Sequence, residues 1–151
     1  MIAEKTVKMT VIRDGEEKEV DVRMRYCAAA EQGFETLSGK RMDVFSPTHT
    51  SWDTDGNPTK FDPPTATTQD YLTLAVAAIV AAYARTNEES PVTSEDIIYD
   101  ASPQTIIELI TTVVTLRIQW YKVPDVVQPE LKPDNRKRQK NAQPPTTSSK
   151  K

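Results

Sequence analysis

The side chains that most often carry enzymatic chemistry are scarce in this chain. It holds one histidine, His49, and one cysteine, Cys27. A Cys27–His49 nucleophile pair is conceivable, but Cys27 falls on the apolar stripe of an expected helix, where a thiol is buried and inert. A zinc site would need a second histidine or a cysteine pair, and the widely spaced glycines form no phosphate-binding loop. The sequence therefore predicts a non-enzymatic protein with no catalytic, metal or cofactor-binding residues.

One polar segment matches part of a calcium-binding loop. Counted from Ser51, the third, fifth and twelfth positions carry the carboxylates Asp53, Asp55 and Asp62, and the sixth position carries Gly56; an EF-hand loop has oxygen ligands and a glycine at these positions. However, the first position is a serine, Pro58 interrupts the loop, and two prolines follow where a helix should begin. A simple turn explains these residues better than a calcium site does.

The basic residues near the end of the chain are a second candidate for binding. Arg136, Lys137 and Arg138 form a cluster with Lys140. No aromatic residues accompany the cluster, so specific recognition of single-stranded nucleic acid is not expected. Residues 1–121 carry a net charge of −8 and residues 122–151 one of +5, and an acidic body is poorly suited to phosphate backbones. The cluster is interpreted either as a solubilising tail or as a segment that folds on binding a partner.

Alternating residues predict a β-hairpin over residues 6–24. Val7, Met9 and Val11 alternate with polar residues before Asp14-Gly15, and an equivalent alternation follows this turn signal. Two strands alone are marginally stable in water, so the hairpin must lie against helices or pair with another chain. Its free edge beside Val7, Met9 and Val11 is the predicted partner-binding edge.

Helical periodicity predicts four helices, at about residues 26–38, 68–85, 94–100 and 103–121. Gly39 should cap the first helix and Thr93 with Asp96 the third. The last helix is rich in β-branched residues, but its apolar residues recur at three- and four-residue steps. The predicted buried stripes are Cys27, Ala30, Phe34 and Leu37; Leu72, Val76, Ile79, Val80 and Tyr83; and Ile106, Leu109, Ile110, Val113, Leu116 and Trp120.

Two segments carry the composition of irregular structure. Residues 46–67 contain four prolines and many small polar residues, which predicts a loop. Its length indicates an insertion or a binding element, and the favoured interpretation is that Trp52 and Phe61 pin it to the body. Residues 123–151 contain too few apolar side chains to repay the cost of ordering, which predicts a disordered basic tail. The fold class is therefore mainly α with an N-terminal β-hairpin (α+β), in a single domain over residues 1–122.

Location follows from the cysteine content and the apolar runs. A lone cysteine forms no internal disulfide, which fits a reduced cytoplasmic setting. The longest apolar run, residues 71–83, would span roughly 20 Å as a helix, against about 30 Å of membrane hydrocarbon. We therefore expect a cytoplasmic protein that does not enter a membrane.

Several short motifs follow one another in a recognisable order along the chain. Arg25-Tyr26 follows a strand, and Phe34-Glu35 precedes Gly39-Lys40 and then Val44-Phe45. The apolar helix over residues 71–83 and the helix start at residues 91–96 come next. This order resembles that of the tail assembly chaperones of long-tailed bacteriophages and prophages, and the similarity covers residues 5–121.

The resemblance implies a partner, a location and an assembly state. Such a chaperone binds the tape measure protein, keeps that long apolar helix soluble, recruits tail tube subunits, and is absent from the mature virion. It would work in the cytoplasm of the bacterial host as a homo-oligomer without catalytic residues. The alternative interpretation is a generic non-enzymatic adaptor or structural subunit of a phage or mobile element.

Overall fold

The computed structural model describes residues 2–122, apart from the side chains of His49 and Thr50. The chain divides into a compact unit, Met1–Trp120, and a second unit, Tyr121–Lys151. The predicted tail over residues 123–151, with Arg136, Lys137 and Arg138, lies outside the described residues.

The first element is the predicted hairpin, and it is longer than residues 6–24. Strand β1 (Ala3–Arg13) pairs antiparallel with β2 (Glu16–Tyr26), and Val7 stands opposite Val22. Asp14 and Gly15 make the reversal with φ angles of 55° and 78°, the left-handed values that a tight two-residue turn requires. Because side chains alternate between faces, one face of the hairpin enters the core.

The four predicted helices are present: α1 (Ala28–Ser38), α2 (Thr68–Arg85), α3 (Ser94–Ile98) and α4 (Pro103–Tyr121). Helix α1 begins after Cys27 because the backbone of that residue is extended, with φ at −166°. The prediction that Cys27 lies on the apolar stripe of a helix is therefore wrong. Its half-buried thiol stands at the N-cap and makes no capping hydrogen bond.

Local capping sets three of the helix ends, two of them as predicted and one, at Thr67, that was not predicted. Gly39 ends α1 with a left-handed φ of 72°, and its N–H donates to the Glu35 carbonyl. Thr93 and Asp96 form a capping box at the start of α3. Thr67 and Asp70 form a second capping box, at the start of α2, and each box satisfies two backbone N–H groups.

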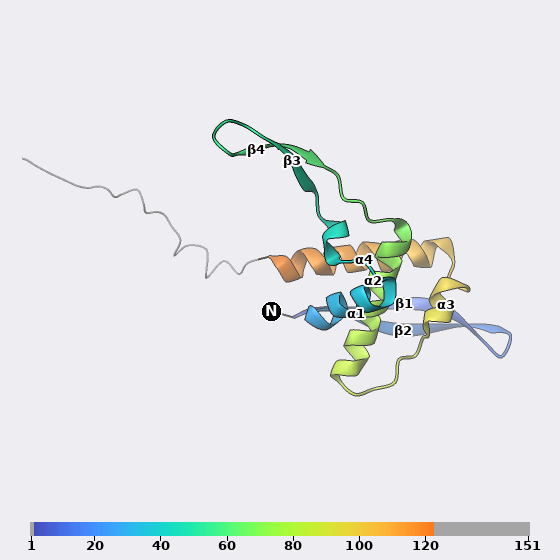
Figure 1. The fold of residues 1–151 in the computed structure, drawn as a ribbon. Helices are drawn as coiled ribbons and strands as arrows, with labels where there is room; N and C mark the ends of the chain where they lie inside the picture. The colour runs from blue at the N-terminus through green and yellow to red at the C-terminus, as the bar shows by residue number, and fades with distance from the viewer. Residues whose placement is uncertain (1, 123–151) are drawn as a thin grey trace, which may run out of the picture. The chain divides into compact units, whose positions relative to one another are not determined.

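Helix α2 is the centre of the fold, and it packs against α1 and β2 (Figure 1). Its alanines allow close approach: a Cβ added at Gly33 of α1 would lie 3.2 Å from the Ala77 Cβ. Gly33 therefore weakens α1 locally but permits tight packing of the two helices. Helix α4 completes the core with buried Leu109, Val113 and Leu116.

Three side chains that were predicted to be buried are exposed instead. Leu37 is 59% exposed, Val80 56% and Trp120 37%. Each follows the helical period of its neighbours, but the body of the protein covers only part of the apolar arc of each helix. Periodicity identifies an apolar side of a helix, and tertiary packing decides how much of it is covered.

The prediction that residues 46–67 form a loop is wrong, because strands β3 (Thr48–Trp52) and β4 (Pro58–Asp62) form a second hairpin there. The Asp53 carboxylate accepts the Asp55 and Asn57 backbone N–H groups, both at 2.9 Å, and so stabilises the turn. Two irregularities in the pairing interrupt strict alternation. The sequence pattern therefore lacked the signal by which a strand is recognised.

The expectation that Trp52 and Phe61 pin this segment to the body is also wrong, since they are 56% and 53% exposed. Phe45, in a 3-10 helix (Met42–Phe45), provides the anchor. Its ring contacts Phe34 and Tyr71 edge-on, with centroids 4.9 Å and 5.0 Å away. The base of the second hairpin is therefore attached to the core, while its aromatic side chains are exposed.

Within residues 2–122, no helix combines the length and the apolarity needed to cross a membrane.

Candidate partner-binding groove

The predicted partner-binding side chains of the first hairpin lie in the core. Val7, Met9 and Val11 are 3%, 1% and 1% exposed, so they cannot contact a partner without unfolding. Their part in the prediction is corrected: these side chains stabilise the fold. Among residues 2–122, β1 pairs only with β2, so the pairing of a partner strand with the outer edge of β1 stays a prediction.

Of the two residues considered as a nucleophile pair, Cys27 is described, whereas the side chain of His49 lies outside the described part of the structure. Within the described part of the chain, no three His, Cys, Asp or Glu residues lie close enough to hold a metal ion. Asp53, the third position of the calcium-like segment, instead accepts hydrogen bonds from its own turn. Those bonds, chiefly the one from the Asn57 backbone, hold the pKa of Asp53 below its ordinary value.

A different surface has the character of a binding site. Three adjoining depressions of about 210, 220 and 340 Å³ surround Leu37, which lines all of them. Helix α1 contributes Leu37, α2 contributes Val76 and Val80, and α3 contributes Ile98. We refer to this surface, Leu37 with the three depressions around it, as the Leu37 groove.

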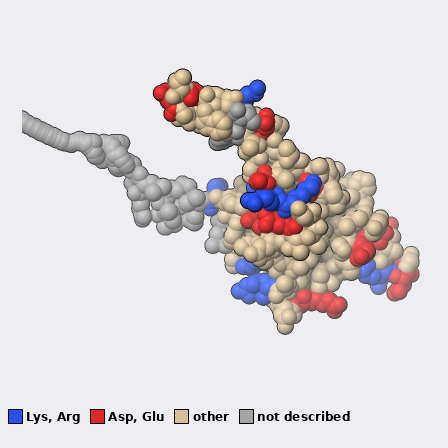
Figure 2. All heavy atoms as spheres, viewed as in Figure 1, with Lys and Arg blue, Asp and Glu red and all other residues tan. Residues whose placement is uncertain are grey.

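The lining of the Leu37 groove is uncharged. None of the residues that line its three depressions is Asp, Glu, Lys or Arg, although these types make up 27% of the chain. The face of the molecule drawn in Figure 2 carries its charges in separate clusters. Depletion of charge together with exposed large apolar side chains is the composition of an interface core.

Small residues shape the part of the groove between α1 and α2. Ala29 and Gly33 line it from α1, while Ala77, Ala81 and Ala84 line it from α2. Their spacing of three or four residues places them along one side of each helix. The result is a shallow trough with the larger Leu37 and Val80 in its wall, into which the ridge of another helix could fit.

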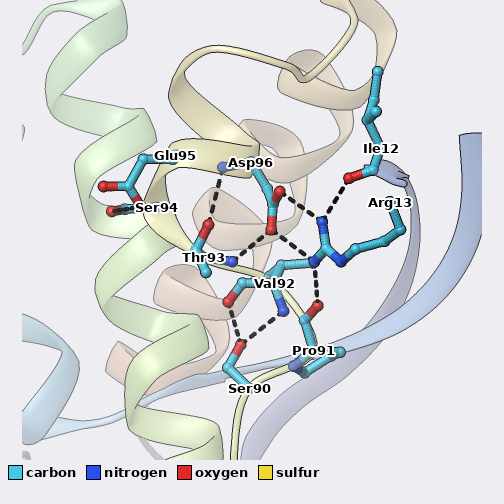
Figure 3. A network of polar contacts seen from close by, with 9 residues as sticks. All are labelled: Ile12, Arg13, Ser90, Pro91, Val92, Thr93, Ser94, Glu95 and Asp96. Carbon is cyan, nitrogen blue, oxygen red and sulfur yellow. Dashed lines mark hydrogen bonds and ion pairs between the residues drawn. The ribbon is translucent and has the colours of Figure 1, made fainter. Parts of the chain in front are cut away.

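An ion pair fixes the α3 side of the groove (Figure 3). Arg13, at the end of β1, donates two hydrogen bonds to the Asp96 carboxylate, both at 2.9 Å. The same guanidinium donates to the carbonyls of Ile12 and Pro91 at 3.0 and 2.9 Å. Asp96 also accepts the Thr93 backbone N–H at 2.8 Å. Arg13 thus ties the tip of the first hairpin to the start of α3.

These bonds change the acidity of Asp96. Chiefly because of the Arg13 hydrogen bonds, the pKa of Asp96 falls from its ordinary value of 3.8 to about 2. Burial of the carboxyl opposes the shift, and the bonds from Thr93 assist it. Both members of the Arg13–Asp96 ion pair are therefore fully charged at neutral pH.

A second ion pair fixes the α1 side of the groove. Lys40, just after α1, donates to both oxygens of Asp70 at 3.0 and 3.1 Å. Burial of the Asp70 carboxyl acts to raise its pKa, but bonds from Thr67 and Lys40 outweigh this effect and lower it. The C-terminal end of α1, next to Leu37, is therefore bonded to the start of α2. This bond holds Leu37 in a fixed position.

The chain shows no match to any protein-family model, to any curated protein or to any solved structure. Function must therefore be argued from the groove itself. Sequence reasoning missed the groove because it assigned Leu37 and Val80 to the core. The small residues recurring on both helices were the one available signal.

Proposed function

We propose that this protein is a phage tail assembly chaperone that holds an apolar helix of the tape measure protein in the Leu37 groove and recruits tail tube subunits. The uncharged groove carries the proposal. A long helix with an apolar face needs a cover in water, and helix-in-groove recognition supplies one through apolar anchors. The groove offers such anchors in Leu37, Val80 and Ile98, which are all substantially exposed.

The motif order that resembles this chaperone family supports the proposal separately. In this chain Gly39 ends the helix that carries Leu37, and Thr93 with Asp96 starts the helix that carries Ile98. The motif residues therefore position two sides of the groove, so a family role in partner binding would account for their occurrence together.

Coexpression tests the proposal. The partner is a tape measure fragment that aggregates when it is expressed alone, and the measured quantity is the soluble fraction of that fragment. The native chain should keep it soluble, while Leu37→Asp should abolish the effect because a carboxylate would be buried in an apolar contact. Leu37 is exposed in the free protein, so its substitution should change stability by less than about 0.5 kcal/mol.

Ile107→Asp is the matched control. Ile107 lies on α4, is 64% exposed and does not line the groove. This variant should solubilise the fragment as well as the native chain does. If the soluble fraction of the fragment falls equally with both variants, the chain binds it by nonspecific hydrophobic association. Failure of the native chain to solubilise the fragment, in a genome without a neighbouring tape measure gene, would favour the generic adaptor.

A further inference from the structure

The second hairpin is unusual because most of its surface is open to water. All five residues of β4 are exposed, and Trp52 and Phe61 expose more than half of their surface. An isolated two-stranded hairpin is marginally stable in water, and large exposed aromatic side chains usually mark a contact surface. We call residues 48–62 the arm.

The base of the arm is fixed. The Ala66 N–H donates to the Val44 carbonyl at 2.9 Å and thereby closes the base. Phe45, directly beside Val44, is buried in the core. Figure 1 shows the arm, β3 and β4, extending from this base beyond the helices of the same unit. The body therefore holds the arm at its base, and more than half of the surface of Trp52 and of Phe61 faces solvent.

We propose that the arm of one copy docks in the Leu37 groove of a second copy, and that a partner helix displaces it; the second half of this inference rests on the proposed function. Every chain carries both surfaces, and its own arm leaves Trp52 and Phe61 exposed. The groove is uncharged. Lys60 and Asp62 flank Phe61 in β4, and because successive side chains of a strand point to opposite faces, Phe61 can enter the groove while these two charges stay outside it.

The size of the contact makes it reversible. Complete burial of an aromatic side chain covers roughly 150–250 Å², and Trp52 and Phe61 are already almost half covered. The two side chains therefore contribute far less than the area of about 1,200 Å² at the lower end of stable interfaces. A head-to-tail contact of this kind joins unlike surfaces, so it can continue from copy to copy. Self-association should therefore be weak, increase with concentration, and yield to a longer apolar helix.

Mixing two defective variants tests the docking. Trp52→Ser/Phe61→Ser removes the arm contacts, and Leu37→Asp disables the groove. Each protein alone should be monomeric in sedimentation velocity, with circular dichroism checking that it is folded. Mixed together, they should form a dimer, because the intact arm of one meets the intact groove of the other. A native chain that is monomeric at every concentration, a self-associating arm variant, or a mixture that stays monomeric would overturn the inference.

Competition tests the displacement. The probe is a synthetic amphipathic helical peptide with leucine along one face. It should dissociate the native assembly into monomers and bind the arm variant at least as tightly as the native chain. If the peptide binds but the native assembly does not dissociate, the arm and the helix use different sites. That result would overturn the proposed displacement. If the mixed dimer forms but no peptide binds, the docking stands and the proposed function fails.

Discussion

At the scale of single residues, Asp96 combines two structural tasks. It caps α3 through Thr93 and holds the tip of the first hairpin through Arg13. The Asp96 side chain is 9% exposed, so the loss of its charge would leave the Arg13 contacts weakened at a site with little water to replace them. The α3 side of the Leu37 groove depends on this carboxylate.

Asp96→Asn should lower the free energy of unfolding at pH 7 by about 1–3 kcal/mol. Because the folded-state pKa of Asp96 is about 2 and the unfolded value is about 3.9, its contribution is present above pH 4. This contribution is lost as the pH falls from about 4 to about 2. Urea unfolding followed by circular dichroism should show the two proteins converging in that window.

The exposed neighbour Glu95 provides the control for this measurement. Glu95→Gln should change the free energy of unfolding by less than about 0.5 kcal/mol at pH 7. If Asp96→Asn still lowers the free energy of unfolding by the same amount at pH 2, the effect arises from packing and not from the Arg13–Asp96 ion pair.

At the scale of elements, α2 contributes neighbouring residues to the core and to the open wall of the Leu37 groove. Ile79 lies at the floor of one depression of the groove but is only 2% exposed, so it packs mainly in the core, whereas its neighbour Val80 is 56% exposed and forms the open wall of the groove. Stability and partner binding should therefore respond to different residues of the same helix.

Ile79→Ala should cost about 2–4 kcal/mol of unfolding free energy, because it leaves a cavity in the core. Val80→Ala should cost less than about 0.5 kcal/mol but weaken binding of the helical peptide. Denaturant melts and fluorescence titrations of the two variants measure these effects. Equal stability losses at both positions would mean that Val80 is covered in solution.

The arm should be dispensable for folding. Replacing residues 48–62 by a short Gly/Ser linker leaves Phe45 and the Ala66–Val44 hydrogen bond in place. The melting temperature should therefore stay within a few degrees of the native value, while self-association is lost. Calorimetry that finds the core destabilised would show that the arm packs on its own body.

At the scale of the whole molecule, charge and binding surface are separated. The ion pairs Arg13–Asp96 and Lys40–Asp70 lie beside the Leu37 groove, and none of the residues that line the groove is charged. Contacts made in the groove should therefore depend little on salt, in contrast to contacts made by the predicted basic tail.

Affinity for the helical peptide should change by less than about twofold between low and physiological ionic strength. Calorimetric titration at several salt concentrations measures this dependence. A steep loss of affinity with salt would instead implicate the cluster Arg136, Lys137 and Arg138. Removing residues 123–151 would then abolish the salt dependence.

The sequence by itself determined the turns and helix ends that are fixed by interactions between residues close together in the chain. Asp14-Gly15 set the turn of the first hairpin, and the capping residues Gly39 and Thr93 set helix ends. Each of these features arises from hydrogen bonds and φ angles within a few residues, so local chemistry suffices to predict it. The bounds of α2 and α4 followed from periodicity in the same way.

Only the tertiary structure decided which apolar residues are covered. It buried Val7, Met9 and Val11, which had been expected to serve an interface, and it exposed Leu37, Val80 and Trp52. Burial depends on which elements meet, and those contacts join residues far apart in the chain. The irregular pairing of β3 with β4 likewise left no periodic pattern to read. The groove and the arm therefore exist because the packed elements leave apolar surface uncovered.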